Sequence, residues 1–189
     1  ETYSVYQKAP DLAGTTFVAG YDFINNDSHP NDDEGHGTHV CGTIAQTTNN
    51  NLGVAGIAYN CAIMPVKVLD SAGSGTADAL ANGLYWAADH GADVINMSLG
   101  WPPGYNPGAT VENAVAYAYN HGVTLCAASG NDSQTTVAYP AAYNNYCIAV
   151  GATRYDEAVA YYSNTGSALD ITAPGGDVTI DQNGDGYVD

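Results

Sequence analysis

The chain has 189 residues, of which 45% are hydrophobic, so it is long enough to bury a core of its own. It carries 3 Lys and Arg residues against 20 Asp and Glu residues, which gives a formal net charge of -17. Such a surface repels phosphate backbones and argues against nucleic acid as a partner, and no apolar run reaches the roughly 20 residues of a membrane span. The charge suits calcium binding, a saline habitat or a cationic substrate, or serves solubility alone.

Short apolar runs alternate with helix-like stretches along the chain. Helices are predicted over three stretches, and the last two open with a Thr as possible N-cap (Thr76, Thr110) and end at a glycine (Gly91, Gly122). The three helical stretches are residues 37–46, 76–90 and 110–121. The predicted strands are residues 16–20, 63–69, 94–99, 123–128 and 147–151. This alternation predicts an α/β fold with a mostly parallel sheet, in which active sites gather at the carboxyl ends of the strands.

The four cysteines have no spacing typical of a metal site. Cys126 and Cys147 lie in apolar, strand-like runs, where a buried free thiol is the simplest interpretation.

The strongest motif is residues 35–43, Gly-His-Gly-Thr-His-Val-Cys-Gly-Thr. Its two histidines, His36 and His39, are spaced so that both could bind a metal from one helix, but the Glu and the third ligand of a zinc protease are not placed around them. A general base at the start of a helix, packed closely through Gly37 and Gly42, fits the pattern better. A metalloprotease that uses both histidines stays a separate hypothesis, which zinc analysis would test.

This segment resembles the HGTHVAG histidine motif of the subtilase family of serine proteases, and further matches follow in order over most of the chain. They are residues 10–12, 49–56, 65–69, 94–100, 127–131, 139–140, 148–152, 163–164 and 171–175. The resemblance implies a subtilisin-like, three-layer α/β fold with a mostly parallel central sheet, incomplete here, so that residues 1–189 are a partial catalytic domain. It also implies a secreted serine endopeptidase whose substrates are polypeptides.

The resemblance assigns roles to several side chains. His36 would be the general base, with His39 as a structural partner, and Asn131 would donate its amide to the oxyanion of the tetrahedral intermediate, unless it is only a turn residue. Two backbone segments would bind the substrate as an added strand, one on each side of the cleft. They are Ser98, Leu99 and Gly100 on one side and Gly73, Ser74 and Gly75 on the other.

Calcium is the expected cofactor, with two candidate sites. The first resembles the structural calcium site of the family, although an ordinary Asn-rich turn would look similar; its ligands would be Asp11, Thr48, Asn50, Leu52 and Val54. The second lies in an acidic insertion, residues 177–189, and follows the D-x-[DN]-x-[DN]-G spacing of a calcium loop, although a frayed acidic tail is the alternative. Its ligands would be Asp181, Asn183, Asp185, Tyr187 and Asp189, and it lacks a closing Glu, so weaker binding is expected.

Two family motifs do not occur in the chain. No GTSMA-type serine motif is present, and residues 1–4, Glu-Thr-Tyr-Ser, stand where the D-[ST]-G turn of the catalytic Asp would be. We therefore expect no peptidase activity from these 189 residues alone. In the resembled family, the strand that leads to this Asp lies between the strands that correspond to residues 63–69 and 94–98. Its absence would leave a slot in the sheet, which residues 2–6 or a second copy of the chain could fill, the latter giving a homo-oligomer. The alternative function is a truncated, non-catalytic module that binds calcium or peptide.

Overall fold

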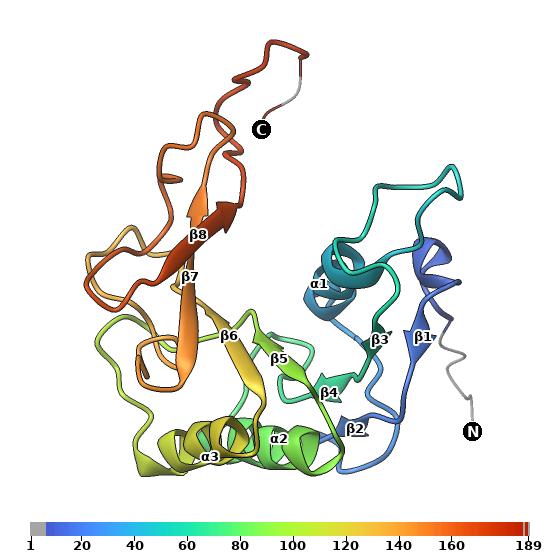
Figure 1. Ribbon diagram of the computed structural model, residues 1–189, viewed down its shortest axis with the longest axis vertical. Helices are drawn as coiled ribbons and strands as arrows, with labels where there is room; N and C mark the ends of the chain where they lie inside the picture. The colour runs from blue at the N-terminus through green and yellow to red at the C-terminus, as the bar shows by residue number, and fades with distance from the viewer. Residues whose placement is uncertain (1–6, 187, 189) are drawn as a thin grey trace. The chain divides into compact units, whose positions relative to one another are not determined.

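The computed structural model describes residues 7–186 and 188 (Figure 1). The chain forms two compact units, Glu1–Gly83 and Leu84–Asp189, and each is taken here by itself. Residues 2–6, predicted as a possible replacement strand, lie outside the described residues. Among the residues that are described, no helix is long and apolar enough to cross a membrane.

Unit 1 is built on two short parallel strand pairs. The pairs are β1 (Thr16–Phe17) with β3 (Ala62–Ile63) and β2 (Tyr21–Asp22) with β4 (Val66–Lys67). The single strand predicted over residues 63–69 is therefore wrong, because Pro65, which has no N–H to donate, separates β3 from β4. The predicted strand 16–20 also ends early, at Phe17. At its predicted end, a Cβ on Gly20 would lie 2.1 Å from the Pro65 carbonyl oxygen, so the two backbone segments are in close contact there.

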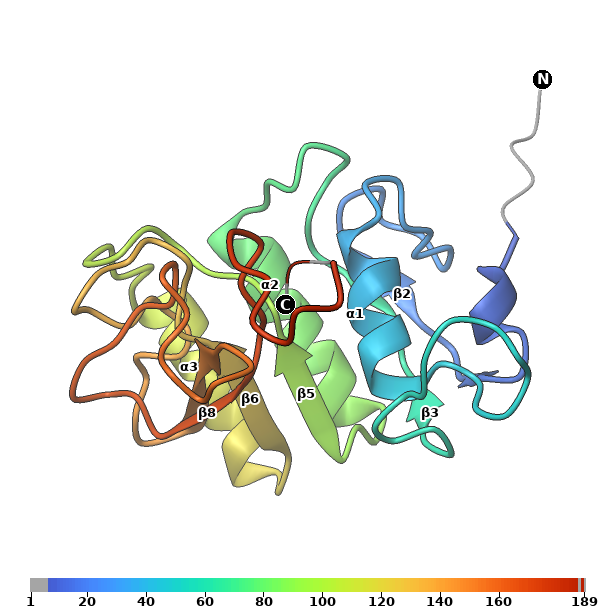
Figure 2. The same ribbon diagram turned by 90° about the horizontal axis from the view of Figure 1, so that it is seen from above.

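The helix that begins at His36 is the main helix of unit 1. This helix, α1 (His36–Ala45), packs against β3 and against the short 3-10 helix η1 (Pro10–Leu12), as Figure 2 shows for β3. It matches the predicted helix 37–46 within one residue. A second helix, α2 (Ala77–Asp89), matches the prediction of 76–90 and runs across the boundary between the units.

Unit 2 holds a four-stranded sheet in the order β5-β6-β7-β8, with every pair parallel. The strands are β5 (Val94–Met97), β6 (Thr124–Ala128), β7 (Cys147–Thr153) and β8 (Ile171–Pro174), and β8 runs beside β7 in Figure 1. The first three were predicted as strands, whereas the residues of β8 were predicted only as part of a family motif. The predicted parallel α/β class is confirmed.

One face of this sheet is buried with a helix beside it. Alternate strand residues point into the core, with Leu125 and Ala127 each 1% exposed. Helix α3 (Ala109–Asn120) contacts β6 and buries one apolar face at helical spacing. The residues of that face, all 0% exposed, are Val111, Ala114, Val115 and Ala118.

The helix ends follow the predicted signals with one exception. The Thr76 hydroxyl accepts the N–H of Ala79 at 3.1 Å, so this N-cap is confirmed. Thr110 as an N-cap is wrong, because it lies inside α3, whose N-cap is a glycine with no side-chain bond. Gly91 and Gly122 follow α2 and α3 with φ of +83° and +84°, the left-handed conformation in which helices commonly end.

The four cysteines are free thiols. Cys147 is buried as predicted, and burial raises the pKa of its thiol to about 12. Cys126 is only half-buried, so the prediction of full burial is wrong for that residue.

A core substitution tests this packing. Leu125→Ala should destabilise unit 2 by about 2–5 kcal/mol, because it removes a fully packed side chain and leaves a cavity. Amide exchange of residues 124–128 in urea measures the effect. Val94→Ala on β5 is the control, since Val94 is 60% exposed and should change stability little. Equal effects of the two substitutions would contradict the assigned core.

Candidate active site

The Asp32 carboxylate fixes the start of the helix that carries His36. One of its oxygens accepts the N–H of Glu34 at 3.1 Å and of Gly35 at 2.9 Å. The other accepts the N–H and the hydroxyl of Thr38 at 2.7 and 2.6 Å. Gly35 adopts φ +111° directly before the helix, so the chain turns sharply into His36. These bonds satisfy N–H groups that a helix start leaves without partners.

The same bonds control the charge of Asp32. Burial disfavours its charged form, but the hydrogen bonds from Thr38, Gly35 and Glu34 outweigh burial and hold the pKa of this carboxyl well below its usual value of 3.8. Asp32 is therefore fully ionised wherever the protein is folded near neutral pH.

His36 is exposed at the first position of α1 and follows three acidic residues of the preceding loop, Asp32, Asp33 and Glu34. The backbone N–H of His36 donates to the Glu34 carboxylate at 2.8 Å. Asp33 instead pairs with the Lys67 ammonium at 2.5 Å, and the Lys67 side chain is only 9% exposed. The exposed His36 side chain thus extends from a helix start whose backbone N–H groups bond to the carboxylates of Asp32 and Glu34.

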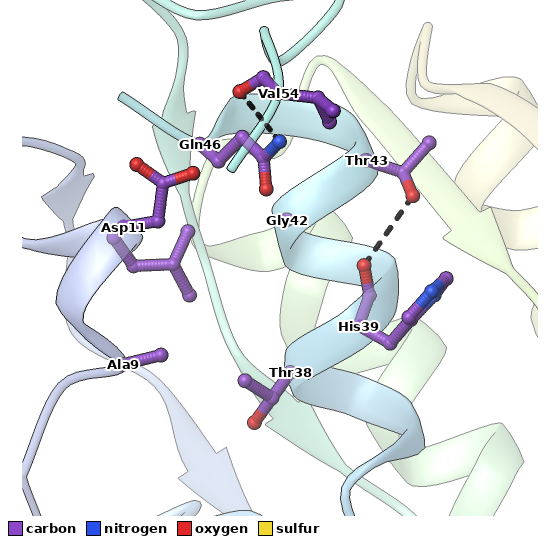
Figure 3. A pocket seen from close by; sticks show the side chains of 9 residues that line it. Ala9, Asp11, Thr38, His39, Gly42, Thr43, Gln46 and Val54 are labelled. Atoms are coloured by element: carbon purple, nitrogen blue, oxygen red, sulfur yellow. Dashed lines mark hydrogen bonds between the residues drawn. The ribbon is translucent and has the colours of Figure 1, made fainter. Parts of the chain in front are cut away.

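A pocket of about 220 Å³ lies between η1 and α1 in unit 1 (Figure 3). His39 and Thr43 line it from α1 and Gln46 from the residue after it, while Asp11 lines it from η1 and Val54 from a loop. The His39 imidazole points away from the Asp11 carboxylate in this view. Among the described residues, no group of three His, Cys, Asp or Glu side chains is placed to bind a metal.

Asp11 joins the pocket to the predicted first calcium site. Its Oδ1 accepts the Asn50 side-chain amide at 2.6 Å, and Asn50 Oδ1 accepts the N–H of Leu52 at 3.1 Å. Asp11 Oδ2 is buried and has no hydrogen-bond partner among the described residues. A Cβ on Gly53 would lie 2.3 Å from that oxygen, so the loop approaches it closely. A buried carboxylate oxygen without a partner is costly, and a hard cation would satisfy it.

The remaining predicted ligands lie on the same loop. The Val54 carbonyl accepts the Gln46 side-chain amide at 2.6 Å, and a carbonyl oxygen keeps a second lone pair for a cation (Figure 3). Asn49 and Asn51 adopt φ near +60° on either side of Asn50, which bends the loop tightly. The residues present therefore fit calcium, and the carbonyls of Thr48 and Leu52 remain predicted ligands.

The second predicted calcium loop is folded around Asp181. Its Oδ1 accepts the N–H of Gly184 at 2.7 Å and its Oδ2 accepts the N–H of Gly186 at 2.9 Å. Asn183 Oδ1 accepts the N–H of Asp185 at 2.8 Å. The predicted ligands Tyr187 and Asp189 lie outside the described residues. This site stays a prediction.

The predicted substrate segment at residues 73–75 is an exposed turn held by Asp70. The Asp70 carboxylate accepts the N–H of Ser74 at 3.0 Å and of Ala72 at 2.9 Å, and these bonds lower its pKa. A Cβ on Gly75 would lie 2.3 Å from the Val68 carbonyl oxygen, so only glycine fits there. The turn presents Gly73 and Ser74 to solvent.

The predicted segment at residues 98–100 follows β5 in unit 2. The Ser98 hydroxyl accepts the Asn96 amide at 3.0 Å. A Cβ on Gly100 would lie 2.9 Å from the Tyr139 carbonyl oxygen, which also accepts the N–H of Trp101 at 3.0 Å. The chain thus crosses tightly at Gly100, directly after a strand, at the edge where the family resemblance places the substrate.

Asn131 lies in the loop that follows β6, where the carboxyl ends of parallel strands gather. Its side chain is exposed, and the residue before it, Gly130, adopts φ +107°. A Cβ on Gly130 would lie 2.3 Å from the amide nitrogen of Asn164. His36 and Gly73–Gly75 belong to unit 1, whereas Ser98–Gly100 and Asn131 belong to unit 2.

Comparison with known proteins decides the family. The profile of the subtilase family (peptidase S8) matches residues 4–188. The chain belongs to the subtilase family. It is 47% identical over 171 residues to thermitase of Thermoactinomyces vulgaris, which covers 90% of this chain and 60% of thermitase. It is 46% identical over 178 residues to a thermophilic serine proteinase of Bacillus sp. strain AK1, with 94% and 43% covered.

Solved structures confirm the subtilisin-like fold. A protease of Pseudoalteromonas arctica superimposes with a TM-score of 0.81 at 32% identity, covering 93% of this chain and 61% of the protease. A cold-adapted subtilisin-like serine proteinase gives 0.77 at 35% identity, covering 88% and 58%. The chain thus spans 43–60% of the length of the two curated relatives.

Sequence patterns did not reveal two residues that organise the site. Asp32 fixes the helix start, and an Asp shortly before a helix could have signalled a cap. Gln46 holds the Val54 carbonyl at the first calcium loop, and no sequence signal distinguishes this Gln from any other residue at a helix end.

The Asp32 carboxylate predicts how unit 1 responds to acid. Because its pKa in the folded chain lies below 3.8, its contribution is complete above pH 3.8 and is lost as the pH falls toward the folded pKa. Asp32→Asn should lose about half of the cap, because its amide has a single acceptor oxygen, and it should flatten this acid-dependent loss, which acid titration of the free energy of unfolding measures. Asp93→Asn, at an exposed Asp, should keep the acid dependence of the parent chain. An unchanged acid profile in Asp32→Asn would contradict the assigned role.

Proposed function

We propose that these residues serve a secreted, calcium-stabilised serine endopeptidase, with residues 1–189 as part of its catalytic domain and residues 177–189 as an acidic insertion. The observation that carries the proposal is His36, exposed at the start of α1 and held there by Asp32 and Glu34, in a chain of the subtilase family. The family hydrolyses peptide bonds, and its activity is proposed for the protein to which these residues belong.

In this reaction His36 acts as general base and then as general acid. Its exposed imidazole takes the proton of the attacking serine hydroxyl and passes it to the leaving amine. The serine and the carboxylate that orients the imidazole come from motifs that are not in this sequence. The chain's own contribution is the rigid first turn of α1, which fixes the position of the base.

Asn131 and the two backbone segments act on the substrate. The exposed Asn131 amide donates to the oxyanion that forms as the carbonyl carbon becomes tetrahedral. Ser98–Gly100 and Gly73–Gly75 hydrogen-bond an extended polypeptide as an added strand. Gly100, which has no side chain, leaves room for the substrate residue before the scissile bond.

Calcium stabilises unit 1 in this proposal. Asp11 and Asn50 hold it with the carbonyls of Thr48, Leu52 and Val54. The buried Asp11 Oδ2, which has no hydrogen-bond partner within residues 7–186, supports this ligand set. The loop of Asp181, Asn183 and Asp185 is a second, weaker site. The cation supplies charge for the buried carboxylate and takes no part in bond cleavage.

Two features indicate which partners the chain binds in this proposal, its acidic surface and the edge strand β5. A net charge of -17 favours polypeptides with basic groups over nucleic acid. In the part of the chain that the structure describes, β5 pairs only with β6, and Val94 on it is 60% exposed. A second copy could pair along β5, and a sedimentation coefficient above that of the monomer is the expected result for the isolated chain.

The 189-residue chain alone should not hydrolyse a chromogenic peptide in a manner sensitive to serine-protease inhibitors. Loss of the serine alone costs about six orders of magnitude in kcat in this enzyme class. The natural polypeptide, expressed with its flanking coding sequence, should hydrolyse the same peptide. Inhibitor-sensitive cleavage by the 189 residues would overturn the assignment of the missing groups.

Substitutions in the natural polypeptide test the base. His36→Ala should lower kcat by about six orders of magnitude, because the triad acts as a unit. His90→Ala is the matched control, since His90 stacks on Trp86 at 4.0 Å at the end of α2 and has no role in the proposed reaction. Equal activity of the two variants would refute His36 as the base, and an inactive natural polypeptide would favour the non-catalytic module.

Calcium should raise the melting temperature of the 189-residue chain. At a free concentration 100 times the dissociation constant, one site adds about 2.7 kcal/mol of stability. Asp11→Asn should abolish most of this gain, whereas Asp181→Asn should remove only the smaller part due to the second loop. Calorimetry with and without calcium measures both. A full calcium response in Asp11→Asn would exclude the first site.

A further inference from the structure

The loop that carries Asn131 rests on a second segment of unit 2, residues 161–165, called here the support segment. Hydrogen bonds join the support segment to the residues on both sides of Asn131. They run from Asn164 N–H to Gly130 O (2.9 Å), Asp132 N–H and Gln134 N–H to Asn164 Oδ1 (2.9 and 3.0 Å), Ser133 N–H to Tyr162 O (2.9 Å), Ser133 hydroxyl to Tyr161 O (2.6 Å) and Thr165 N–H to Gln134 O (2.8 Å).

Asn131 stands apart from its neighbours. Its side chain is exposed and makes none of these bonds, whereas Gly130 and residues 132–134 are each tied to the support segment. A side chain that must meet a short-lived charge needs a fixed backbone and a free amide, because a donor already in position costs no reorganisation during the reaction. Within the part of the chain that the structure describes, the loop has both properties.

Asn164 is the centre of the support segment. It is 0% exposed, and besides the two bonds to its Oδ1 its side-chain amide donates to Asp132 Oδ2 at 3.2 Å. Its backbone carbonyl accepts the Ser129 hydroxyl at 3.0 Å, so the same residue also holds the end of β6. Gly130 packs directly on this amide, since a Cβ there would lie 2.3 Å from the nitrogen.

We propose that Asn164 is the positioning residue for Asn131, holding the backbone on both sides of it so that the Asn131 amide faces the oxyanion. The proposal rests on the oxyanion role of Asn131 in the proposed function. Asn164 does not touch the substrate. It acts through the loop, because one buried amide accepts two N–H groups and donates to a carboxylate of the same loop.

The side-chain chemistry makes a nearly isosteric change informative. Asn164→Asp keeps the volume and can keep the oxygen that accepts the two N–H groups. It replaces the donor to Asp132 with a second carboxylate, so a buried negative charge meets the carboxylate of the exposed Asp132. The double variant Asn164→Asp with Asp132→Asn restores the bond with donor and acceptor exchanged.

The first measurement uses the 189-residue chain. In Asn164→Asp, the amide protons of Asp132 and Gln134 should exchange at least about tenfold faster than in the parent chain, while those of β6 stay protected. The double variant should regain most of the protection. Asn145→Asp, an exposed Asn of the same unit, is the control for an added negative charge and should leave the loop unchanged. Unchanged exchange in Asn164→Asp would overturn the proposal.

The second measurement uses the natural polypeptide with its flanking sequence. Asn164→Asp should lower kcat about 10- to 100-fold with KM within about twofold of the parent, because only transition-state binding is lost. Asn131→Ala should lower kcat about 10²- to 10³-fold, and adding Asn164→Asp to it should cost little more.

The outcomes separate the two hypotheses. A loosened loop with full kcat would refute positioning while the endopeptidase stands. A natural polypeptide without peptidase activity would refute the proposed function and, with it, the catalytic meaning of the support segment. A lower kcat in Asn164→Asp that returns toward the parent value in Asn164→Asp with Asp132→Asn would support positioning. Loss of a residue of merely structural importance would instead raise KM and lower stability together.

Discussion

Parallel pairing in the β5-β6-β7-β8 sheet is the constraint on which unit 2 depends. Parallel strands all end at the same edge, so the segments after β5 and β6 must emerge side by side. That register places the crossing at Gly100 near the turn at Gly130, and both positions need glycine for contact, not for flexibility alone. A sheet of this kind therefore determines where the chemistry can occur before any catalytic residue is chosen.

The same edge explains why so many polar residues of unit 2 are buried without cost. Asn164 and Ser129 are 0% and 2% exposed, yet the Asn164 side chain accepts N–H groups of the loop after β6 and the Ser129 hydroxyl donates to the Asn164 carbonyl. Buried polar groups stabilise the one conformation in which they are hydrogen-bonded, and a buried polar group without a partner lowers the stability of the fold. Unit 1 shows the second case at Asp11, where one carboxylate oxygen has no partner among the described residues.

Much of this architecture could be predicted from the sequence, and the failures have physical causes. Where the apolar pattern is sustained, the predicted ends of helices and strands lie within one or two residues of the observed ends, as for α2 and β6. The strand over residues 63–69 failed because hydrophobicity does not show that Pro65 interrupts a ladder. The cap at Thr110 failed because a glycine before it already starts the helix. Asp32 was missed although an Asp shortly before a helix is a cap signal. Asn164 was matched only within a family motif, because its partners are set by loop geometry that a sequence pattern does not encode.

The scarcity of basic residues has a further consequence. Lys67 is 9% exposed and paired with Asp33, and Arg154 is 24% exposed between Asp156 and Asp177. Lys8, whose ammonium lies 4.8 Å from the centre of the Phe17 ring, is the third and last cation of the chain. Proteases that cut after lysine or arginine therefore find few accessible bonds in it. The composition that gives this surface its charge therefore also limits the positions at which such proteases can cut these 189 residues.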